Sequence, residues 1–167
     1  MFVEQRLTTV FFLLLLLPFT AAATLSQSPD PAPLPQPSVE REPAEVVQIV
    51  IEALQNNDQP FIDAGIATTY AFASPSNKAN TGPLPRFASM VKGAPYGILV
   101  DHVAHEFSEV VLAGQNAYQM VRIKGPDGSQ VIFAFRLGQQ GEGEFEGMWM
   151  TEAVWPVASG DLPEQAF

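Results

Sequence analysis

The sequence predicts an α+β domain, in which three N-terminal helices pack on one face of a curved antiparallel sheet of about five strands. Between residues 43 and 91, apolar residues recur every three or four positions, which is the spacing of one helix face. From residue 96 to residue 157, short apolar runs are separated by turns that contain Gly, Pro or Asn, as in hairpin-connected strands. Helices followed by strands favour the α+β class, because the helices then have a single sheet to cover.

The helical part begins at Pro43, which suits the first helical position because its missing N–H needs no partner there. Glu42 and Glu45 lie near this end, where the helix dipole favours negative charge. The predicted helices cover residues 43–55, 62–72 and 84–91. The turns or loops between them include Ser74-Pro75-Ser76-Asn77 and Thr81-Gly82-Pro83.

Strands are predicted over residues 98–107, 109–112, 118–124, 130–137 and 145–157. These strands are apolar on both faces: Phe133 and Phe135 point to one side, and Ile132 and Ala134 to the other. One face must meet the helices. The other face needs a ligand cavity, a dimer partner or the helix packing of a curved sheet, because monomers rarely expose large apolar patches.

The N-terminal 23 residues are typical of a secretory signal peptide. A short, weakly charged start precedes the uncharged run 7–17, Pro18 interrupts the run, and Ala21-Ala22-Ala23 supplies the small residues of a cleavage site. The alternative is an uncleaved membrane anchor over residues 7–25, which is long enough to span a bilayer as a helix. Either arrangement places the folded part outside the cytosol, in a periplasm, a thylakoid lumen or the extracellular space.

Three further segments follow the predicted signal peptide. Residues 24–42 are a predicted proline-rich linker, because alternating prolines from Pro29 onward remove backbone donors and favour an extended chain. We expect the single α+β domain over residues 43–157 and a flexible tail over residues 158–167.

Composition limits the possible partners of the chain. The 18 Asp and Glu residues exceed the 8 Lys and Arg residues, and the net charge is −10. This balance argues against binding to nucleic acid or to an anionic membrane surface. A membrane is expected as a partner only through an uncleaved N-terminal segment. Because the chain has no Cys, disulfides, thiol nucleophiles and thiolate metal sites are excluded.

Short motifs along the predicted domain resemble those of one family. They are Glu45-Val-Val-Gln-Ile, Asn57-Asp58, Tyr70-Ala-Phe-Ala-Ser-Pro75, Gly82-Pro-Leu, Arg86-Phe87, Met90-Val91, Pro95-Tyr96 and a final Trp149…Thr151…Val154. Their order resembles the uncharacterised family known as domain of unknown function 4864, over about residues 43–157. The resemblance implies a nuclear-transport-factor-2-like cone, in which helices curl against a bent sheet and often enclose a pocket. It implies no activity, because a fold of this kind hosts enzymes, binders and assembly modules alike.

Both histidines of the chain lie in one short segment, Asp101-His102-Val103-Ala104-His105-Glu106. The spacing H-x-x-H-E matches neither H-E-x-x-H nor H-x-x-E-H, the zinc signatures on helices. In a strand, residues three apart point to opposite faces, so we expect His102 and His105 not to share a metal. The sequence therefore predicts no metal site and no cofactor.

Catalytic motifs are also missing from the sequence. No serine stands in G-x-S-x-G, and the glycine-rich loop 138–143 is acidic rather than suited to phosphate. We therefore assign no catalytic residue.

Arg122 lies in an otherwise apolar strand and needs a partner if it faces inward with Tyr118 and Met120. A carboxylate ligand is one such partner. An ion pair with Glu106, Glu109 or Glu152, or simple exposure, is the favoured alternative. Trp149 and Trp155 are expected to build core rather than a ligand platform. The residues expected to line a pocket are Asp58, Tyr96, His105, Tyr118, Arg122 and Trp149.

Two functional hypotheses follow from the sequence. The favoured one is a non-catalytic module that binds a small apolar ligand or assembles as a homodimer. The alternative is a small enzyme in which Asp58, Tyr96 and His105 supply acid–base groups in one pocket. Two titratable groups with shifted pKa values in one cleft would favour the enzyme. An apolar lining with a few paired polar groups would favour the binding module.

The signal-peptide hypothesis predicts that the mature protein begins near Thr24, because Ala21-Ala22-Ala23 follows a short apolar run broken by Pro18. An intact-mass measurement on protein from its native host checks this prediction. An uncleaved chain recovered in the membrane fraction would instead support the anchor.

Overall fold

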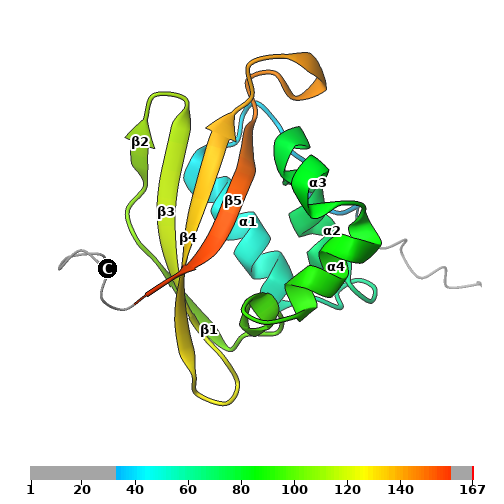
Figure 1. The fold of residues 1–167 in the computed structure, drawn as a ribbon, viewed down its shortest axis with the longest axis vertical. Coiled ribbons are helices and arrows are strands. Elements are labelled where there is room, and N and C mark those ends of the chain that lie inside the picture. Colours follow the sequence, from blue (N-terminus) through cyan, green and yellow to red (C-terminus); the bar gives the residue numbers. More distant parts are fainter. Residues whose placement is uncertain (1–32, 159–166) are drawn as a thin grey trace, which may run out of the picture. The chain divides into compact units, whose positions relative to one another are not determined.

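The helices and strands form two layers (Figure 1): four α-helices cover one face of a five-stranded antiparallel sheet. This computed structural model describes residues 33–158 and Phe167. The predicted signal peptide, residues 24–32 of the linker and residues 159–166 of the tail lie outside the described residues. The elements are α1 (Pro43–Gln55), α2 (Ala64–Ala71), α3 (Pro75–Thr81), α4 (Leu84–Lys92), the 3₁₀ turn η1 (Tyr96–Leu99), β1 (Ala104–Phe107), β2 (Val111–Ala113), β3 (Asn116–Lys124), β4 (Gln130–Gln139), the 3₁₀ turn η2 (Gly143–Phe145) and β5 (Trp149–Val157).

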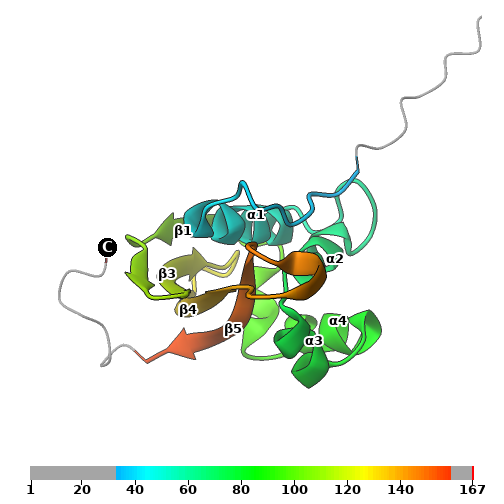
Figure 2. The same cartoon turned by 90° about the horizontal axis from the view of Figure 1, so that it is seen from above.

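Helix α1 packs against the sheet and forms the centre of the core. It begins at Pro43 as predicted, and its buried face consists of Val46, Val47, Val50, Ile51 and Leu54. This face meets Val121, Ile123, Phe133, Phe135 and Leu137 from β3 and β4 in one hydrophobic cluster. Seen from above in Figure 2, α1 lies alongside β1 and β3, whereas α3 and α4 lie beyond β5.

A glycine allows α2 to cross α1 at close range. A Cβ atom at Gly65 would lie 2.1 Å from the Ala53 carbonyl oxygen of α1, so only glycine fits. The buried Asn57 holds this crossing, because its carbonyl accepts a bond from Gly65 N and its Oδ1 accepts one from Ile66 N. Asn57 thereby satisfies two of the free N–H groups at the start of α2.

The sequence analysis predicted three helices, but the described residues form four. Ser74-Pro75-Ser76-Asn77, taken as a turn, is the start of α3. The Ser74 hydroxyl accepts a hydrogen bond of 3.0 Å from Asn77 N, and Pro75 occupies the first helical position. Ser74 and Pro75 are therefore the N-cap and the first residue of a helix. The same two residue types are also common in turns, which is why the sequence did not distinguish the two structures.

The first predicted strand, 98–107, is also wrong in its first half. Residues 96–99 form η1, and β1 begins only at Ala104. The run Ile98–Val100 is apolar because it packs against the core cluster, and burial alone does not distinguish a strand from a short turn.

The sheet has the order β1-β3-β4-β5, and β2 pairs with β3 on the same side as β1. All pairs within the sheet are antiparallel. In β5, Glu152 is an extra residue, because Arg136 pairs with Ala153 whereas the next residue, Leu137, pairs with Thr151. Ala73, between α2 and α3, forms a parallel bridge with Thr151 and so joins the helical layer to the edge of the sheet.

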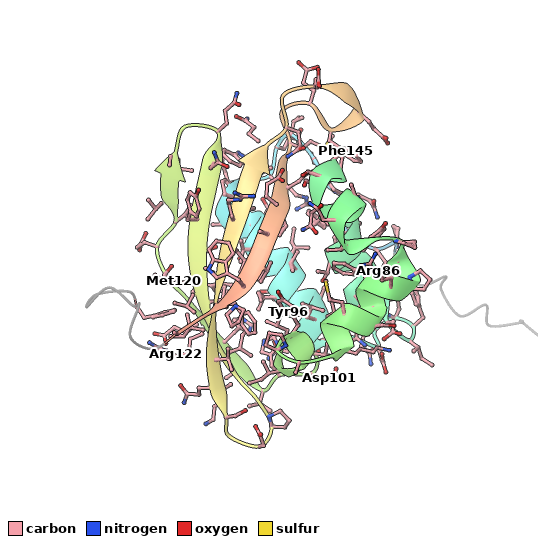
Figure 3. The ribbon with its side chains drawn as sticks, viewed as in Figure 1. Arg86, Tyr96, Asp101, Met120, Arg122 and Phe145 are labelled. Atoms are coloured by element: carbon pink, nitrogen blue, oxygen red, sulfur yellow. The ribbon has the colours of Figure 1, made fainter. Side chains whose placement is uncertain are left out.

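The two faces of the sheet differ in exposure. Gln119, Val121 and Ile123 of β3 are buried towards the helices. Met120 and Arg122 lie on the opposite face (Figure 3), where Arg122 forms an ion pair with Glu106. Tyr118 and Trp155 on this face are 37% and 41% exposed. The sequence analysis expected a ligand cavity, a dimer partner or further helix packing on the second face, and a dimer partner on this face stays a prediction.

No helix among the described residues is long and apolar enough to cross a membrane.

The close crossing of α1 and α2 predicts that Gly65→Ala destabilises the domain by about 1–3 kcal/mol, because the new methyl group overlaps the Ala53 carbonyl. Gly141→Ala is the matched control, since its Cβ meets nothing within 4 Å and its φ is not positive. Urea unfolding of both variants checks the prediction. Equal stability of the two variants would contradict this packing.

Candidate functional site

An apolar cavity of about 280 Å³ lies between the helical layer and β5. Its walls come from α1, α2, α3, α4, η1, β4 and β5, so no single segment of the chain defines it. The apolar lining consists of Val50, Leu54, Ala73, Phe87, Met90, Val91, Leu99, Phe135, Ala153 and Val154. Asn80 and Met90 are themselves exposed, which places the opening of the cavity near α3 and α4.

Hydroxyl groups around the cavity are held by backbone carbonyls. Tyr96 Oη donates to the Val154 carbonyl at 3.1 Å, which fixes η1 against β5. Thr69 Oγ1 donates to Gly65 O, and Thr81 Oγ1 donates to Asn77 O, each at 2.9 Å. Figure 3 places Tyr96 between the sheet and the helices. The proton of each of these three hydroxyls is therefore engaged by the backbone.

Thr151 is the unusual polar residue of the cavity. Its backbone is fully engaged: its N–H donates to Phe72 O, and its carbonyl accepts from Ser74 N and from Asn77 Nδ2. Its side-chain hydroxyl has no partner, although the residue is only 5% exposed. A buried polar group without a hydrogen bond is costly and rare in folded proteins. The hydroxyl oxygen itself has almost no accessible surface, so it is shielded from the cavity as well as from solvent.

Glu152 belongs to the cavity lining, but its carboxylate lies over Gly138 on the face of the sheet away from the helices. As the extra residue of the β4–β5 pairing, its side chain reaches Gln140, whose Nε2 donates to Glu152 Oε1 at 3.1 Å. Among the residues that line the cavity, all of them in the described part of the chain, there is no Lys, Arg or His.

The structure places the six predicted pocket residues in different regions. Tyr96 lines the cavity, whereas the other five do not. Tyr118 and Arg122 lie on the far face of the sheet, as described above. Trp149 is half-buried at the start of β5 and packs against the core cluster. Asp58 belongs to a separate polar depression, and His105 lies in β1 beside His102.

The polar depression around Asp58 is held together by its own charges. Asn57 Nδ2 donates to Asp58 Oδ1 at 2.8 Å and to Asp63 Oδ1 at 3.0 Å. Lys92 forms an ion pair with Asp63 at 2.6 Å, and this hydrogen bond lowers the pKa of Asp63 below its ordinary value. These contacts join the segment after α1, the N-cap of α2 and the last residue of α4, so the depression has a structural role.

The two histidines, expected on opposite faces of a strand, contact each other directly. His102 Nε2 lies 2.9 Å from His105 Nδ1, and His102 Nδ1 lies 2.8 Å from the Leu99 carbonyl. The expectation was wrong because His102 precedes β1, where side chains do not alternate. Burial lowers the pKa of His102. Among the described residues, no group of three or more acidic or histidine side chains is arranged to hold a metal ion.

Sequence reasoning missed Thr151, Glu152 and Asn77 as cavity residues. The sequence does set Glu152 apart, because it is a single charge within an otherwise apolar strand. Thr151 and Asn77 become cavity residues only through the bridge between Ala73 and β5. No local sequence pattern predicts that bridge.

The fold and the cavity together define a small α+β domain with a mostly apolar cavity between its helices and its sheet. Residues 39–158 match the family described as Domain of unknown function (DUF4864), and the chain belongs to this family. The resemblance found in the short motifs is therefore confirmed for the family. No curated protein and no solved structure matches the chain.

The unpartnered hydroxyl predicts that Thr151→Val stabilises the ligand-free domain by about 1 kcal/mol, because the isosteric valine removes a buried polar group that lacks a hydrogen bond. A rise of a few degrees in the melting temperature is the expected measurement. The control is Thr69→Val, which removes a hydroxyl that is hydrogen-bonded and is expected to lower stability. Destabilisation by Thr151→Val would show that its hydroxyl has a partner.

Proposed function

We propose that the domain is a non-catalytic module that binds a small, mostly apolar molecule in the cavity between the helices and β5. The observation that carries this proposal is the cavity of about 280 Å³, whose lining is mostly apolar and includes a few polar residues. Binding sites for small molecules have this composition: an apolar lining with a few polar groups that fix orientation.

The cavity volume limits the size of the ligand. An apolar cavity of roughly 150 Å³ binds benzene, and pockets for drug-sized molecules begin at roughly 300 Å³. The observed volume of about 280 Å³ therefore suits a molecule of about eight to twelve carbon atoms.

The alternative of an enzyme has less support. That hypothesis required acid–base groups from Asp58, Tyr96 and His105 in one cleft, and only Tyr96 lines the cavity. Tyr96 is hydrogen-bonded to a backbone carbonyl, as expected of a group that fixes the position of η1.

Two further proposals concern the setting of the domain. The helices pack against one face of the sheet with a cavity between the two layers, and this arrangement supports assignment of the fold as a nuclear-transport-factor-2-like cone. The sequence pattern of residues 1–23 supports export of the domain from the cytosol.

Filling the cavity should abolish binding. Val154 points from β5 towards the helices and lines the cavity, whereas Val157 lies on the far face of the same strand. We expect octan-1-ol to raise the melting temperature of the wild-type protein and of Val157→Phe, but not that of Val154→Phe. The reason is that a ligand stabilises the folded state only where its site is free.

Thermal unfolding at increasing concentrations of octan-1-ol is the measurement, and sedimentation verifies that the variants keep the mass of the wild type. If octan-1-ol and other eight-carbon probes leave the wild-type melting temperature unchanged, the cavity is not a binding site.

A further inference from the structure

We infer that the contact between His102 and His105 makes the attachment of η1 to β1 dependent on pH: the two side chains keep their hydrogen bonds with one added proton and lose them with two. The contact joins the two elements directly. His102 Nδ1 lies 2.8 Å from the carbonyl of Leu99, the last residue of η1, and His102 Nε2 lies 2.9 Å from His105 Nδ1 in β1. The inference concerns the stability of the domain rather than a ligand, and so goes beyond the proposed function.

The partners of His102 determine which of its nitrogens carries the proton. A backbone carbonyl only accepts hydrogen bonds, so the bond to Leu99 requires a proton on His102 Nδ1. His102 is 2% exposed, and burial lowers the pKa of its imidazole, which favours the neutral ring. In a neutral ring with its proton on Nδ1, the other nitrogen is an acceptor. His105 must therefore donate from its own Nδ1 to His102 Nε2.

The pair can take up one proton without losing a hydrogen bond. His105 Nε2 has no partner among the described residues and, unlike the Thr151 hydroxyl, is not a fully buried atom. A second proton would have to bind His102 Nε2, which already accepts from His105. Two N–H groups would then face each other at hydrogen-bond distance, next to a second positive charge, so the contact cannot persist.

The charges around His102 do not remove this cost. Burial is the largest influence on its pKa and lowers it, and His105 lowers it further, whereas the Leu99 carbonyl and Asp101 raise it. Within the described part of the chain, neither histidine forms an ion pair with an Asp or Glu. The charged side chains of β1 and β3 nearby lie on the opposite face of the sheet, because their register positions alternate with the buried Ile123: Glu106, Arg122 and Lys124.

The charged residues of the helices next to η1 are engaged elsewhere. Both α1 and α4 contact η1. Lys92 of α4 forms an ion pair with Asp63, and Glu52 of α1 accepts a hydrogen bond from Gln48. The remaining charged residues of these two helices are exposed: Glu45 and Arg86. A proton on His102 therefore gains little from the helical layer.

The direction of the pH dependence follows from proton uptake in the two states. The unfolded chain binds a proton at His102 near pH 6.5, whereas the folded domain binds it only at lower pH. The stabilisation by the neutral pair is therefore complete above about pH 6.5 and is lost as the pH falls below that value. Because one proton is involved, the equilibrium constant for unfolding should rise by up to about tenfold for each pH unit in this range. Tyr96 and Leu99 of η1 line the cavity, so the element that loses its attachment is one wall of the cavity.

Two variants of the full chain test the inference by urea unfolding between pH 5.5 and 7.5, where the two histidines of the chain titrate. His102→Gln removes the group whose protonation breaks the contact, so the pH dependence of unfolding should be lost. His105→Gln is the matched control: it keeps an N–H that can donate to His102 and leaves His102 able to titrate, so the wild-type pH dependence should remain. If His102→Gln retains that dependence, or if His105→Gln loses it, the inference is wrong.

Nitrogen-15 NMR of the wild-type imidazoles provides a test that does not require the variants to fold. The chain has two histidines, so each ring can be assigned from one variant or the other. We expect His102 to carry its proton on Nδ1 at pH 7.5 and to take up a second proton only below pH 6.5. A proton on Nε2 of neutral His102, or titration of this ring at or above pH 6.5, overturns the inference.

Discussion

The arrangement of this domain depends on the hydrogen bonds that join residues 72–74 to Thr151 at the edge of the sheet. Thr151 N–H donates to Phe72 O at 2.9 Å, and Thr151 O accepts from Ser74 N and Asn77 Nδ2 at 3.0 Å each. Since a buried hydrogen bond contributes about 1 kcal/mol, these three bonds hold α3 against β5 with an energy that matters in a marginally stable domain. The cavity lies between these two layers, and Thr151 and Asn77 both belong to its lining.

The polar side chains of the lining also bond to the backbone. Asn77 and Tyr96 donate to the carbonyls of Thr151 and Val154, and the bulge at Glu152 turns the Glu152 side chain towards Gln140. The polar groups of the lining are thus positioned by backbone contacts rather than by each other. A site built in this way is preorganised, because a ligand does not have to order the side chains that it meets.

The sequence predicted most of the fold but only a small part of the site. Periodicity and Pro43 located α1, because the signal lies within the helix itself. The cap Ser74-Pro75 was mistaken for a turn, since the same two residues suit both structures. Tyr96 was identified as a pocket residue, whereas Thr151 was not, because its role depends on a bridge to a residue 78 positions earlier in the chain. Arg122 and Tyr118 were candidates because the sequence does not reveal which face of β3 meets the helices.

The edges of the sheet have a consequence for how copies of this chain meet at high concentration. A strand edge with free N–H and C=O groups is a template for another strand, and proteins block such edges with proline, charge or short strands. Strand β5 carries Pro156, which offers no N–H, and its other end is covered by Ala73. On the opposite edge, β1 and β2 are short and are separated by a segment that contains Glu109. Strand-by-strand growth into a fibril is therefore blocked at both edges, and aggregation through extended sheets is disfavoured even when the protein is concentrated.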